Sequence, residues 1–354
     1  MILRGIALFT LAAILAAAGL VYFFVHLQPY AGFDEPVFID IPRGTSTREL
    51  AAKLERNGVV RSDWQFLLVR ILRPKALLQA GEYRFAHPAS PWEVFDRIVR
   101  GDIFYYELAV PEGSNIFDIA AALERLGLMT ADAFLEAARD PSLIRDLAPE
   151  APSLEGYLFP STYRIARHTT AIQICREMTA EFRRVWEKLG GNGDVHRKVT
   201  LASLVEKEAR VPSERPLIAS VYWNRLKQGM RMDADPSTIY AALLENRYRG
   251  TIYRSDLERD HPYNTYRKAG LPPGPIANPG ADALRAVLEP AETAYLYFVR
   301  IPDSSGAHEF NETLAEHNRA VARYRRGIQG QNQAPRPAGV SQGNANRLPQ
   351  RNGK

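Results

Sequence analysis

A glutamate near the end of an amphipathic segment is the residue in this sequence best suited to acid–base chemistry. The segment VTLASLVEKEARVP runs from Val199 to Pro212, and its apolar side chains recur at the spacing of one helix face. On a helical wheel Glu208 falls within this apolar stripe, whereas Glu206 is turned about 160° away, toward the flank. Pro212 disfavours helical geometry at Val211, so the helix is predicted to stop there and to hold Glu208 in its last turn.

This placement predicts a raised pKa for Glu208. Apolar surroundings disfavour the carboxylate, and so does the negative end of a helix dipole, so both effects push the pKa of Glu208 upward. A carboxyl group that keeps its proton at neutral pH is what a general acid needs. The alternative is a structural Glu208 paired with Arg215 or Arg225, which would lower its pKa instead. Periodicity alone leaves both interpretations open.

A single embedded acid suits the cleavage of a glycosidic bond, because the leaving oxygen must be protonated as oxocarbenium character develops. Hydrolases of this kind normally use a second carboxylate, for which the candidates are Glu155, Asp233 and Asp235. Aromatic and amide side chains near these acids could stack on sugar faces and bond sugar hydroxyls, namely Tyr157, Tyr240, Tyr263, Asn264 and Tyr266. The alternative for each of these aromatic residues is a place in the protein core.

Motifs of several other chemistries are absent from the sequence. It contains no GxxxxGK[ST] phosphate loop, no GxSxG nucleophile elbow and no HExxH zinc site. The seven histidines lack the spacing of metal ligands, and the single Cys175 can form neither an internal disulfide nor a cysteine-based zinc site. We therefore expect a site without a metal or cofactor, in a fold held together by packing.

The elements that must position these residues are helices and short strands. After a polar and aromatic loop at 154–165, helices are predicted over 170–189, 198–210, 214–228 and 314–325, and a buried strand over 294–300. A loop over 259–280 has five prolines and three glycines between His261 and Gly280, and unstructured loops of this length are usually functional. The expected fold class is α+β, with a mainly helical catalytic domain that carries a small sheet.

An internal repeat precedes this region. IDIPRGTSTRELAAKLERNGVV from Ile39 aligns with LAVPEGSNIFDIAAALERLGLM from Leu108 at a constant offset of 69 residues. Each copy predicts a short strand, a Pro-x-Gly turn, an amphipathic helix closed by a glycine and a second short helix, around 64–72 and 132–138. Such modules resemble LysM-like units, which bind glycan chains. A spacer domain is the alternative.

The N-terminus carries an apolar stretch without a charge, the 21 residues from Gly5 to Val25. About 20 apolar residues suffice to cross the hydrocarbon core of a membrane. Arg4 precedes the stretch, whereas Asp34, Glu35 and Asp40 follow it, so the N-terminus is predicted to be cytoplasmic and the body to face outward. A cleaved signal peptide is the alternative, although its apolar region is typically about 7 to 15 residues long.

The composition argues against disorder and against a nucleic-acid partner. Hydrophobic residues make up 46% and charged residues 24% of the 354 residues, as in ordinary globular proteins of about two domains. The net charge is +5, and residues 327–354 hold four cations and no acid, which leaves +1 for the rest of the chain. A near-neutral body is a poor electrostatic footprint for DNA or RNA. The basic tail is predicted to be disordered.

Eight longer motifs follow one another in the C-terminal two thirds of the chain. They are EGYLFPSTY at Glu155, LASLVEKEA at Leu201, SVYWNRL at Ser220, MRMDADPSTIYA at Met230, YNTY at Tyr263, GLPPGPIANPG at Gly270, YLYFV at Tyr295 and HEFNETLAEHN at His308. Their order and gaps closely resemble the YceG-like family, the endolytic murein transglycosylases, and the resemblance covers about Ile39 to Arg325. The chain departs from the commoner pattern in a loop less rich in tryptophan at EGYLFPST and in Ala234 and Ser237, where threonines are frequent.

This resemblance implies an enzyme with one N-terminal span and LysM-like modules before the catalytic domain. Family members cut nascent peptidoglycan strands internally, between N-acetylmuramic acid and N-acetylglucosamine. It implies a lytic mechanism, in which one glutamate protonates the glycosidic oxygen and then acts as base on the muramyl C6 hydroxyl, which closes on C1. The product is a 1,6-anhydro end formed without water, so a second carboxylate is not needed. The catalytic glutamate of the family corresponds to the second acid of EKE, hence Glu208.

These interpretations give one set of expectations. The expected domains are a cytoplasmic N-terminus (1–4), a transmembrane helix (5–25), a linker (26–38), tandem LysM-like modules (39–140), a catalytic domain (141–326) and a tail (327–354). Glu208 is the expected catalytic residue, and the expected substrate-binding residues are Glu155, Tyr157, Asp235, Tyr240, Asn264 and Tyr266, with no metal.

The expected location is the inner membrane of a bacterium, in a single pass, with the catalytic domain in the periplasm or otherwise outside the cytoplasm. Peptidoglycan strands are the expected substrate, peptidoglycan synthases of that membrane the expected protein partners, and nucleic acid is not expected. Two rival functions remain, a non-catalytic glycan-binding scaffold for wall-synthesis enzymes and a hydrolase that leaves reducing ends.

Overall fold

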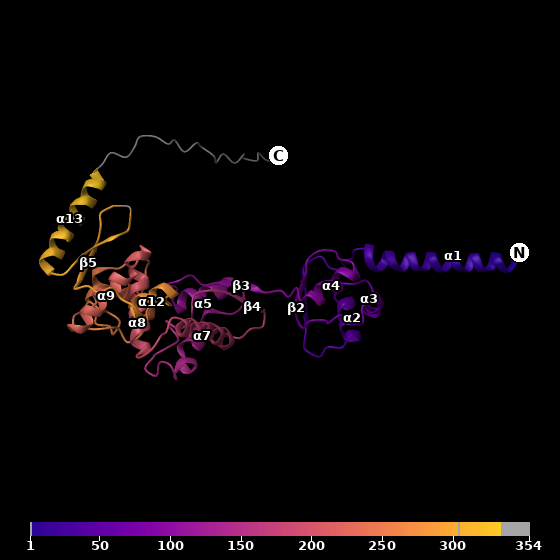
Figure 1. Cartoon of the computed structure of the whole chain (residues 1–354), viewed down its shortest axis with the longest axis horizontal. Coiled ribbons are helices and arrows are strands. Elements are labelled where there is room, and N and C mark those ends of the chain that lie inside the picture. Colours follow the sequence, from indigo (N-terminus) through magenta and orange to yellow (C-terminus); the bar gives the residue numbers. More distant parts are fainter. Residues whose placement is uncertain (1, 304, 334–354) are drawn as a thin grey trace, which may run out of the picture. The chain divides into compact units, whose positions relative to one another are not determined.

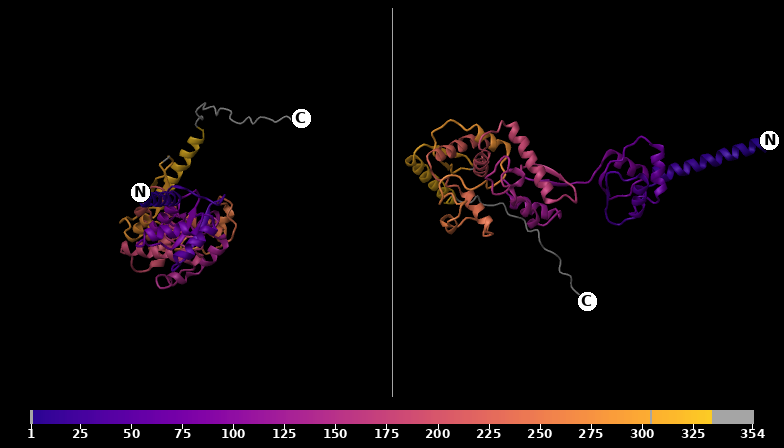
Figure 2. Two further views of the ribbon diagram at one scale, coloured as in Figure 1. Left: turned by 90° about the vertical axis from the view of Figure 1, so that its right-hand side faces the viewer. Right: turned by 90° about the horizontal axis from the view of Figure 1, so that it is seen from below.

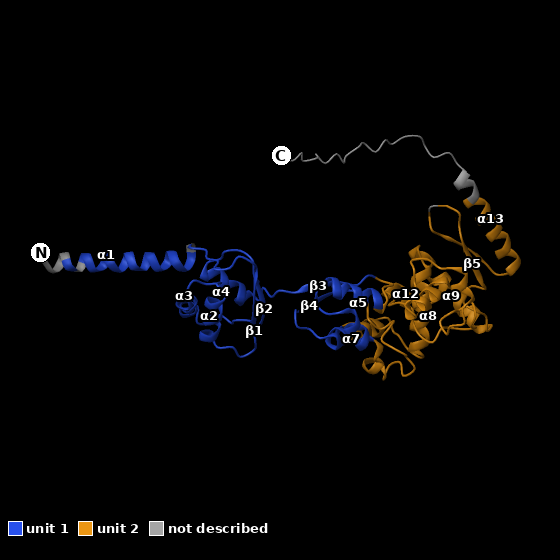
Figure 3. Cartoon of the chain, turned by 180° about the vertical axis from the view of Figure 1, so that it is seen from behind, with its two compact units in different colours: residues 1–111, 117–138, 160–177 blue, residues 112–116, 139–159, 178–354 orange. Residues whose placement is uncertain are grey.

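The computed structural model describes residues 2–303 and 305–333 (Figure 1). The chain forms two compact units that are interleaved in sequence (Figure 3). Unit 1 comprises residues 1–111, 117–138 and 160–177, and unit 2 comprises residues 112–116, 139–159 and 178–354. Among the described residues, helices are combined with three two-stranded antiparallel sheets, so the fold is of the mixed α+β class, as predicted.

The chain begins with the apolar helix α1 (Ile2–Tyr22), which continues into a π-helical turn, η1 (Phe23–Leu27). The segment Leu8–His26 is long and apolar enough to cross a membrane, with a mean hydropathy of 2.4, and only 6% of it is buried. Figure 2 shows α1 as a lone helix that leaves the rest of unit 1. The turn η1 is different, because Val25 is 1% exposed and belongs to the hydrophobic core of unit 1.

Both copies of the sequence repeat fold as strand, helix, helix, strand. The first copy consists of β1 (Val37–Ile41), α2 (Thr47–Arg56), α3 (Asp63–Leu72) and β2 (Gly81–Phe85), followed by α4 (Pro91–Arg100). The second consists of β3 (Tyr106–Ala109), α5 (Ile116–Arg125), α6 (Ala131–Arg139) and β4 (Thr162–Ile165). In each copy the two strands pair antiparallel, with Val37 opposite Phe85 and Tyr106 opposite Ile165. The 69-residue offset therefore holds in the structure for the first strand and first helix of each copy, whereas β4 follows β2 by about 80 residues.

Local sequence signals explain where the helices of the first copy begin. Ser46 caps α2, because its side chain accepts a hydrogen bond from the backbone N–H of Glu49. Ser90 and Glu93 form a capping box at the start of α4, with Pro91 as the first helical residue. The inward faces of these elements make one hydrophobic core, in which the largest fully buried side chains are Ile39, Leu50, Leu54, Phe66, Tyr83, Phe85, Phe95 and Ile98.

Unit 2 holds most of the long motifs on a helical scaffold. Its further elements are η2 (Pro141–Ile144), α8 (Val195–Glu208), η3 (Pro212–Glu214), α9 (Arg215–Lys227), α10 (Asp235–Leu244), α11 (Arg254–Glu258), α12 (Ala281–Leu288), β5 (Tyr297–Arg300), β6 (His308–Asn311) and α13 (Leu314–Gln333), while α7 (Ala171–Lys188) belongs to both units. Helices α8, α9 and α12 pack on one another, α10 packs on α8, and β5 packs on α9.

The C-terminal elements differ from the prediction in two ways. The last helix was predicted to end at Arg325, but α13 continues to Gln333. Gly327 lies so close to Pro302 that a side chain at this position would collide with the proline ring, so the glycine permits this close packing while costing the helix only about 1 kcal/mol. The strand predicted over 294–300 is shorter and only half-buried, because β5 has a single partner strand, β6. The rest of the predicted tail, residues 334–354, lies outside the described residues.

Candidate active site

Glu208 is the last residue of α8. Asp194 starts this helix by accepting a hydrogen bond from the backbone N–H of Arg197, and Ala209 leaves helical geometry with a ψ of 107°. The face that includes Leu201 and Val205 is completely buried against the neighbouring helices. Glu208 itself remains partly exposed, so the sequence pattern places this carboxyl group at the boundary between the core and solvent.

The surroundings raise the pKa of Glu208 to about 7. Burial of the carboxyl group is the main cause, and the negative charge of Asp235 adds to it, whereas the positive charge of Arg225 opposes both. In the part of the chain that the structure describes, no side chain forms a hydrogen bond or an ion pair with the Glu208 carboxyl. A substantial fraction of Glu208 therefore carries a transferable proton at neutral pH.

Arg215 pairs with a different glutamate than Glu208. Its guanidinium lies 3.4 Å from the Glu206 carboxylate, which also accepts a hydrogen bond of 3.0 Å from the backbone N–H of Gly280. The helical wheel directed Glu206 toward the flank, yet its side chain is only 6% exposed, because the loop before α12 covers that side of α8. Of the two acids in the EKE motif, Glu206 is thus paired and structural, whereas Glu208 is unpaired.

Asp235 and Tyr266 share the surroundings of Glu208. Asp235 is the first residue of α10, and its carboxylate accepts a hydrogen bond of 2.7 Å from the Tyr266 hydroxyl. Burial and this hydrogen bond both raise the pKa of the Tyr266 phenol, as does the charge of Glu208. Asp235 is exposed and Tyr266 is partly exposed. These three side chains therefore form one group that opens to solvent.

Arg225 organises the turn that leads to Asp235. The guanidinium is almost buried and donates hydrogen bonds of 2.7 Å to the backbone carbonyls of Met232 and Leu296. It also lies 3.8 Å from the carboxylate of Asp233, whose φ of 49° is in the left-handed region. A non-glycine residue there stores strain of about 1 to 3 kcal/mol, which the surrounding contacts must hold. The turn is consequently fixed in one conformation before α10 begins.

A hydroxyl network joins the start of α10 to the loop that carries Tyr266. The Thr265 hydroxyl accepts a hydrogen bond of 3.0 Å from the backbone N–H of Ala234 and lies 2.8 Å from the hydroxyl of Ser237. The Ser237 hydroxyl in turn donates to the carbonyl of Ala234 at 2.7 Å. All three residues are buried, so the distance between Asp235 and Tyr266 is set by a dry polar network.

The sequence is similar to a known protein family and to named proteins from bacteria. A profile of the YceG-like family matches residues 39–323. The chain belongs to the YceG-like family. A Bacillus subtilis protein named endolytic murein transglycosylase is 33% identical over 309 residues, which cover 81% of this chain and 84% of that protein. A Streptococcus pneumoniae protein of the same name is 29% identical over 321 residues, and the match spans 58% of its length.

A solved structure is also similar to this YceG-like chain. The crystal structure of a YceG-like protein from Listeria monocytogenes aligns with a TM-score of 0.52 and 31% sequence identity. The alignment covers 80% of this chain and 99% of the Listeria chain. The similarity therefore extends over both the repeat region and the region of the long motifs.

Four of the predicted substrate-binding residues of this YceG-like chain are buried, and their polar groups form hydrogen bonds inside the protein. Glu155 accepts hydrogen bonds from the backbone N–H of Ile116 at 2.9 Å and from the side chain of Asn278 at 3.0 Å, and it also bonds Tyr240. The structure therefore places Glu155 and Tyr240 in the scaffold that joins the three segments of unit 2, and does not bring them together with Glu208.

Tyr157 and Asn264 are scaffold residues in the same sense. The Tyr157 hydroxyl lies 2.9 Å from Nδ1 of His196, and its ring is completely buried. The Asn264 amide donates to three backbone carbonyls between Asp256 and Arg259, and its oxygen accepts from the backbone N–H of Tyr266 at 3.1 Å. Asn264 thereby holds the loop of Tyr266 without itself reaching solvent.

Tyr222 lies beside the site but was not among the predicted residues. It is 1% exposed, and its hydroxyl has no hydrogen-bond partner among the described residues. Burial raises the pKa of Tyr222, the charge of Glu208 raises it further, and the charge of Arg225 opposes both. The sequence held a weak signal, because Tyr222 and Arg225 are three residues apart in SVYWNRL and share one face of α9.

The described residues offer no candidate metal centre. No group of three or more histidine, cysteine, aspartate or glutamate side chains in residues 2–303 and 305–333 has the arrangement of a metal site. Cys175 is fully buried, and burial raises the pKa of its thiol to about 12, so it is also a poor nucleophile. The candidate site consists of side-chain acids, phenols and one guanidinium.

Proposed function

We propose that this chain is an endolytic murein transglycosylase, which cleaves peptidoglycan strands between N-acetylmuramic acid and N-acetylglucosamine and leaves 1,6-anhydro ends. The proposal is supported by two relatives of that name in Bacillus subtilis and Streptococcus pneumoniae. The observation that carries it is the unpaired, partly exposed carboxyl of Glu208, whose pKa is raised to about 7. Such a group can first give and then take a proton near neutral pH.

The first step of the proposed reaction is protonation of the leaving oxygen. Glu208 donates its proton to the glycosidic oxygen while the bond to C1 of the muramyl residue breaks, and positive charge develops at C1 and the ring oxygen. The carboxylate of Asp235 lies close enough to raise the pKa of Glu208, so it also lies close enough to stabilise that positive charge. Tyr266 keeps the Asp235 carboxylate in place through its hydrogen bond.

The second step returns the proton to Glu208. The ionised carboxylate accepts the proton of the muramyl C6 hydroxyl, whose oxygen bonds to C1 and closes the 1,6-anhydro ring. No water is consumed, and Glu208 ends protonated and ready for the next cycle. The partial burial that raises the pKa of Glu208 serves both steps, because it makes the acid available and makes the carboxylate a stronger base.

Analysis of the products from purified murein tests this proposal against its rivals. New anhydromuramyl ends support the lytic reaction, reducing muramyl ends support a hydrolase, and binding without new ends supports a non-catalytic scaffold. The proximity of Asp235 makes the hydrolase a real competitor, because such enzymes use a second carboxylate. Mass spectrometry separates the two kinds of end, since an anhydro end is lighter than a reducing end by one water.

We also propose that the apolar N-terminal helix is retained as a membrane anchor, with the catalytic domain outside the cytoplasm. Residues that follow α1 are part of the folded unit 1. Val25 lies in its core, His26 stacks on Trp92 with 4.0 Å between ring centroids, and the carbonyl of Phe24 accepts a hydrogen bond from Gln65. A cleavage near Val25 would remove these contacts, which argues against a signal peptide. The mass of the membrane-bound protein checks this, because cleavage would lower it by about 2 to 3 kDa.

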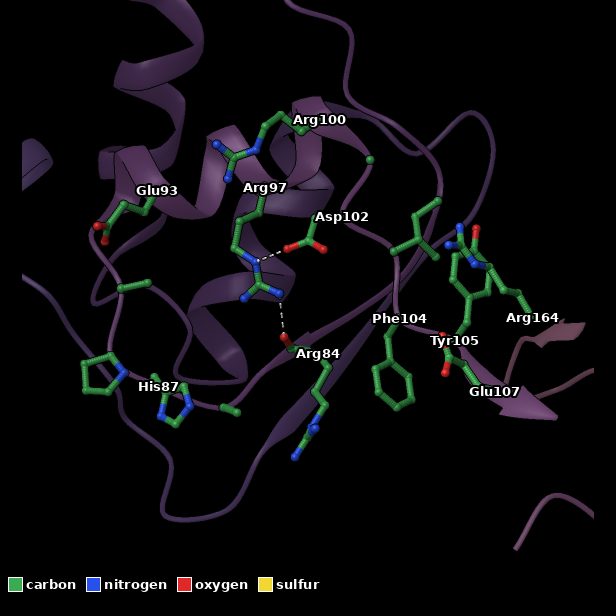
Figure 4. A pocket seen from close by; sticks show the side chains of 15 residues that line it. Arg84, His87, Glu93, Arg97, Arg100, Asp102, Phe104, Tyr105, Glu107 and Arg164 are labelled. Atoms are coloured by element: carbon green, nitrogen blue, oxygen red, sulfur yellow. Dashed lines mark hydrogen bonds and ion pairs between the residues drawn. The ribbon is translucent and has the colours of Figure 1, made fainter. Parts of the chain in front are cut away.

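A cavity in unit 1 favours a second, glycan-holding function for the repeat region. It has a volume of about 880 Å³, and Figure 4 shows that Arg84, Arg97 and Arg100 line it together with the aromatic residues Phe104 and Tyr105. Cations and aromatic rings suit the carboxylates and sugar faces of murein. Arg97 is held by Asp102 and the carbonyl of Arg84. Replacing Arg84 and Arg100 by Ala should weaken sedimentation with murein, and unchanged sedimentation would favour a spacer.

In this proposal residues 5–25 form the anchor, 39–140 the glycan-holding modules and 141–326 the catalytic domain. The substrate would then be met at the outer surface of the inner membrane, where strands are polymerised. Peptidoglycan synthases of that membrane are the proposed protein partners. Crosslinking in intact cells followed by purification of the full chain tests this, and recovery without any glycan polymerase would contradict it.

A further inference from the structure

Helix α3 is apolar on two faces, of which the fold covers one. Phe66 and Val69 are completely buried in the core of unit 1. On the other side Trp64, Ile71 and Leu72 are 47%, 72% and 58% exposed, respectively. Their spacing of seven and eight residues places them along one stripe of the helix. A helix that is apolar all round is normally buried on every side, so this outer face requires a partner.

The segment after α3 adds a further exposed apolar side chain and the cation Lys75. Leu77 is 80% exposed, more than any other large apolar side chain among the described residues. From Gln65 to Gly81 the sequence contains Arg70, Arg73 and Lys75 but no acid, while Asp63 precedes Trp64 and Arg73 is paired with Asp96, which leaves Lys75 as the cation for the headgroups. We call the surface formed by Trp64, Ile71, Leu72 and Leu77 the α3 face. Tryptophan, aliphatic side chains and neighbouring cations are the combination found where proteins rest on anionic lipid.

The end of the apolar N-terminal helix is attached to α3. The side chain of Gln65, in the first turn of α3, donates a hydrogen bond of 3.3 Å to the carbonyl of Phe24. Both α3 and α4 pack against η1, the turn in which the apolar helix ends. A chain that leaves the bilayer at this point brings α3 to the membrane surface without any intervening linker. The lipid headgroups are therefore the partner that is always within reach of the α3 face.

We propose that the α3 face docks on the lipid bilayer, with Trp64, Ile71, Leu72 and Leu77 in the interfacial layer and Lys75 against anionic headgroups. The proposal rests on the proposed anchoring of the N-terminal helix. Its consequence is that unit 1 is held in one orientation on the membrane instead of turning freely about the end of the span.

Site-specific labelling of the full chain in vesicles tests the docking. An environment-sensitive fluorophore is attached at Ile71→Cys or Leu77→Cys, and at Arg48→Cys on the exposed side of α2 as the matched control. Ile14→Cys, within α1, reports on insertion of the span. The buried Cys175 is replaced by Ala so that each protein carries one thiol. Vesicles contain phosphatidylethanolamine and phosphatidylglycerol, with quenchers placed either at shallow depth in the lipid or as iodide in the water.

The expected result is that the shallow lipid quencher acts on labels at 71 and 77 about threefold more strongly than on the label at 48. Iodide should show the opposite order. Replacing phosphatidylglycerol by phosphatidylcholine should reduce the difference, because the attraction of Lys75 is lost.

Three outcomes would overturn the proposal. Labels at 71 and 77 that behave like the label at 48, while the label at 14 is quenched from within the bilayer, would leave anchoring intact and reject docking. Labels at 71 and 77 that are shielded from iodide but not reached by the lipid quencher would assign the α3 face to a second copy or another protein. Failure of the protein to float with vesicles would reject anchoring and docking together.

Discussion

The hydroxyl of Tyr266 donates a hydrogen bond of 2.7 Å to the carboxylate of Asp235, and that carboxylate adds to burial in raising the pKa of Glu208. The two acids lie at opposite kinds of helix end, Glu208 at the C-terminus of α8 and Asp235 at the N-terminus of α10. A helix dipole disfavours a negative charge at the first position and favours it at the second. In the proposed reaction these two carboxyl groups have different tasks, Glu208 as proton donor and Asp235 as the neighbouring negative charge.

This relationship predicts the pH dependence of kcat/KM. The proposed reaction needs protonated Glu208 in the first step, so kcat/KM should fall as the pH rises through about 7. In Asp235→Asn the charge that raises the pKa of Glu208 is gone, so the decline should begin at lower pH. The rate of release of anhydromuramyl products between pH 5 and 9 measures both curves. Asp282→Asn, an exposed change on α12, is the control that should leave the curve in place.

Glu208→Gln should lose activity and gain stability at the same time. Removal of a general acid typically costs about a hundredfold to ten-thousandfold in rate. The folded-state pKa of about 7 lies above the ordinary value of 4.5, so the folded protein loses stability as the pH rises through this interval. Glutamine has no charge to bury, so the variant should be more stable than the parent above pH 7, by about 2 to 3 kcal/mol, and equally stable below pH 4.

Urea denaturation of both proteins at pH 4 and pH 8, with product analysis at pH 6, checks this prediction. Glu206→Gln is the matched control on the same helix. It removes the charge that pairs with Arg215, and because Glu112 also lies 3.9 Å from Arg215, it should destabilise the protein by about 1 to 3 kcal/mol at pH 8. Equal stability of Glu208→Gln and the parent at pH 8 would contradict a buried, proton-holding Glu208.

Glu155→Gln should damage the fold rather than substrate binding. The carboxylate of Glu155 accepts hydrogen bonds from Ile116 and Asn278, and a glutamine amide can replace only one accepting oxygen. We expect a loss of about 2 to 4 kcal/mol in the free energy of unfolding. The fraction that remains folded should keep the KM of the parent for glycan strands. A raised KM with unchanged stability would return Glu155 to the substrate-binding residues.

The sequence pointed to the proposed catalytic glutamate but not to its surroundings. Periodicity and Pro212 were enough to place Glu208 at a helix end, because both signals are local. The proximity of Asp235 depends on the packing of α10 on α8, and the Asp-Pro pair at its start carries no signal of what the helix will pack against. The burial of Glu206 likewise depends on Gly280, 74 residues further along the chain.

The aromatic motifs show a second limit of sequence reasoning. The motifs EGYLFPSTY and YNTY include both buried residues and residues that face the site. Tyr157 in the first motif is enclosed, whereas Tyr266 in the second opens toward the site. A family motif marks positions under constraint without separating a substrate contact from a buried scaffold bond. The repeat was predicted more fully, because an amphipathic helix after a Pro-x-Gly turn is encoded locally. Both copies have the same order of strands and helices in the structure.

The Tyr222 hydroxyl should matter for turnover and not for stability. Burial of a polar group without a hydrogen bond costs about 1 to 3 kcal/mol, so Tyr222→Phe should unfold at the same or a higher urea concentration than the parent. The hydroxyl is enclosed among the charges of Glu208, Asp235 and Arg225, so a sugar hydroxyl supplies its missing partner only when the neighbouring side chains move on glycan binding. Loss of one such bond in the transition state should lower kcat/KM by about fivefold to tenfold.

Tyr157→Phe separates these two effects. Its hydroxyl already has a partner in His196, so this variant should lose about 1 kcal/mol of stability while its kcat/KM stays unchanged. Urea denaturation and the rate of anhydromuramyl release, measured on both variants, give the four values that are needed. If Tyr222→Phe loses stability and keeps its kcat/KM, as Tyr157→Phe is expected to do, then Tyr222 is a packing residue. If Tyr222→Phe is more stable than the parent but has a lower kcat/KM, then the Tyr222 hydroxyl serves turnover although it destabilises the protein without substrate.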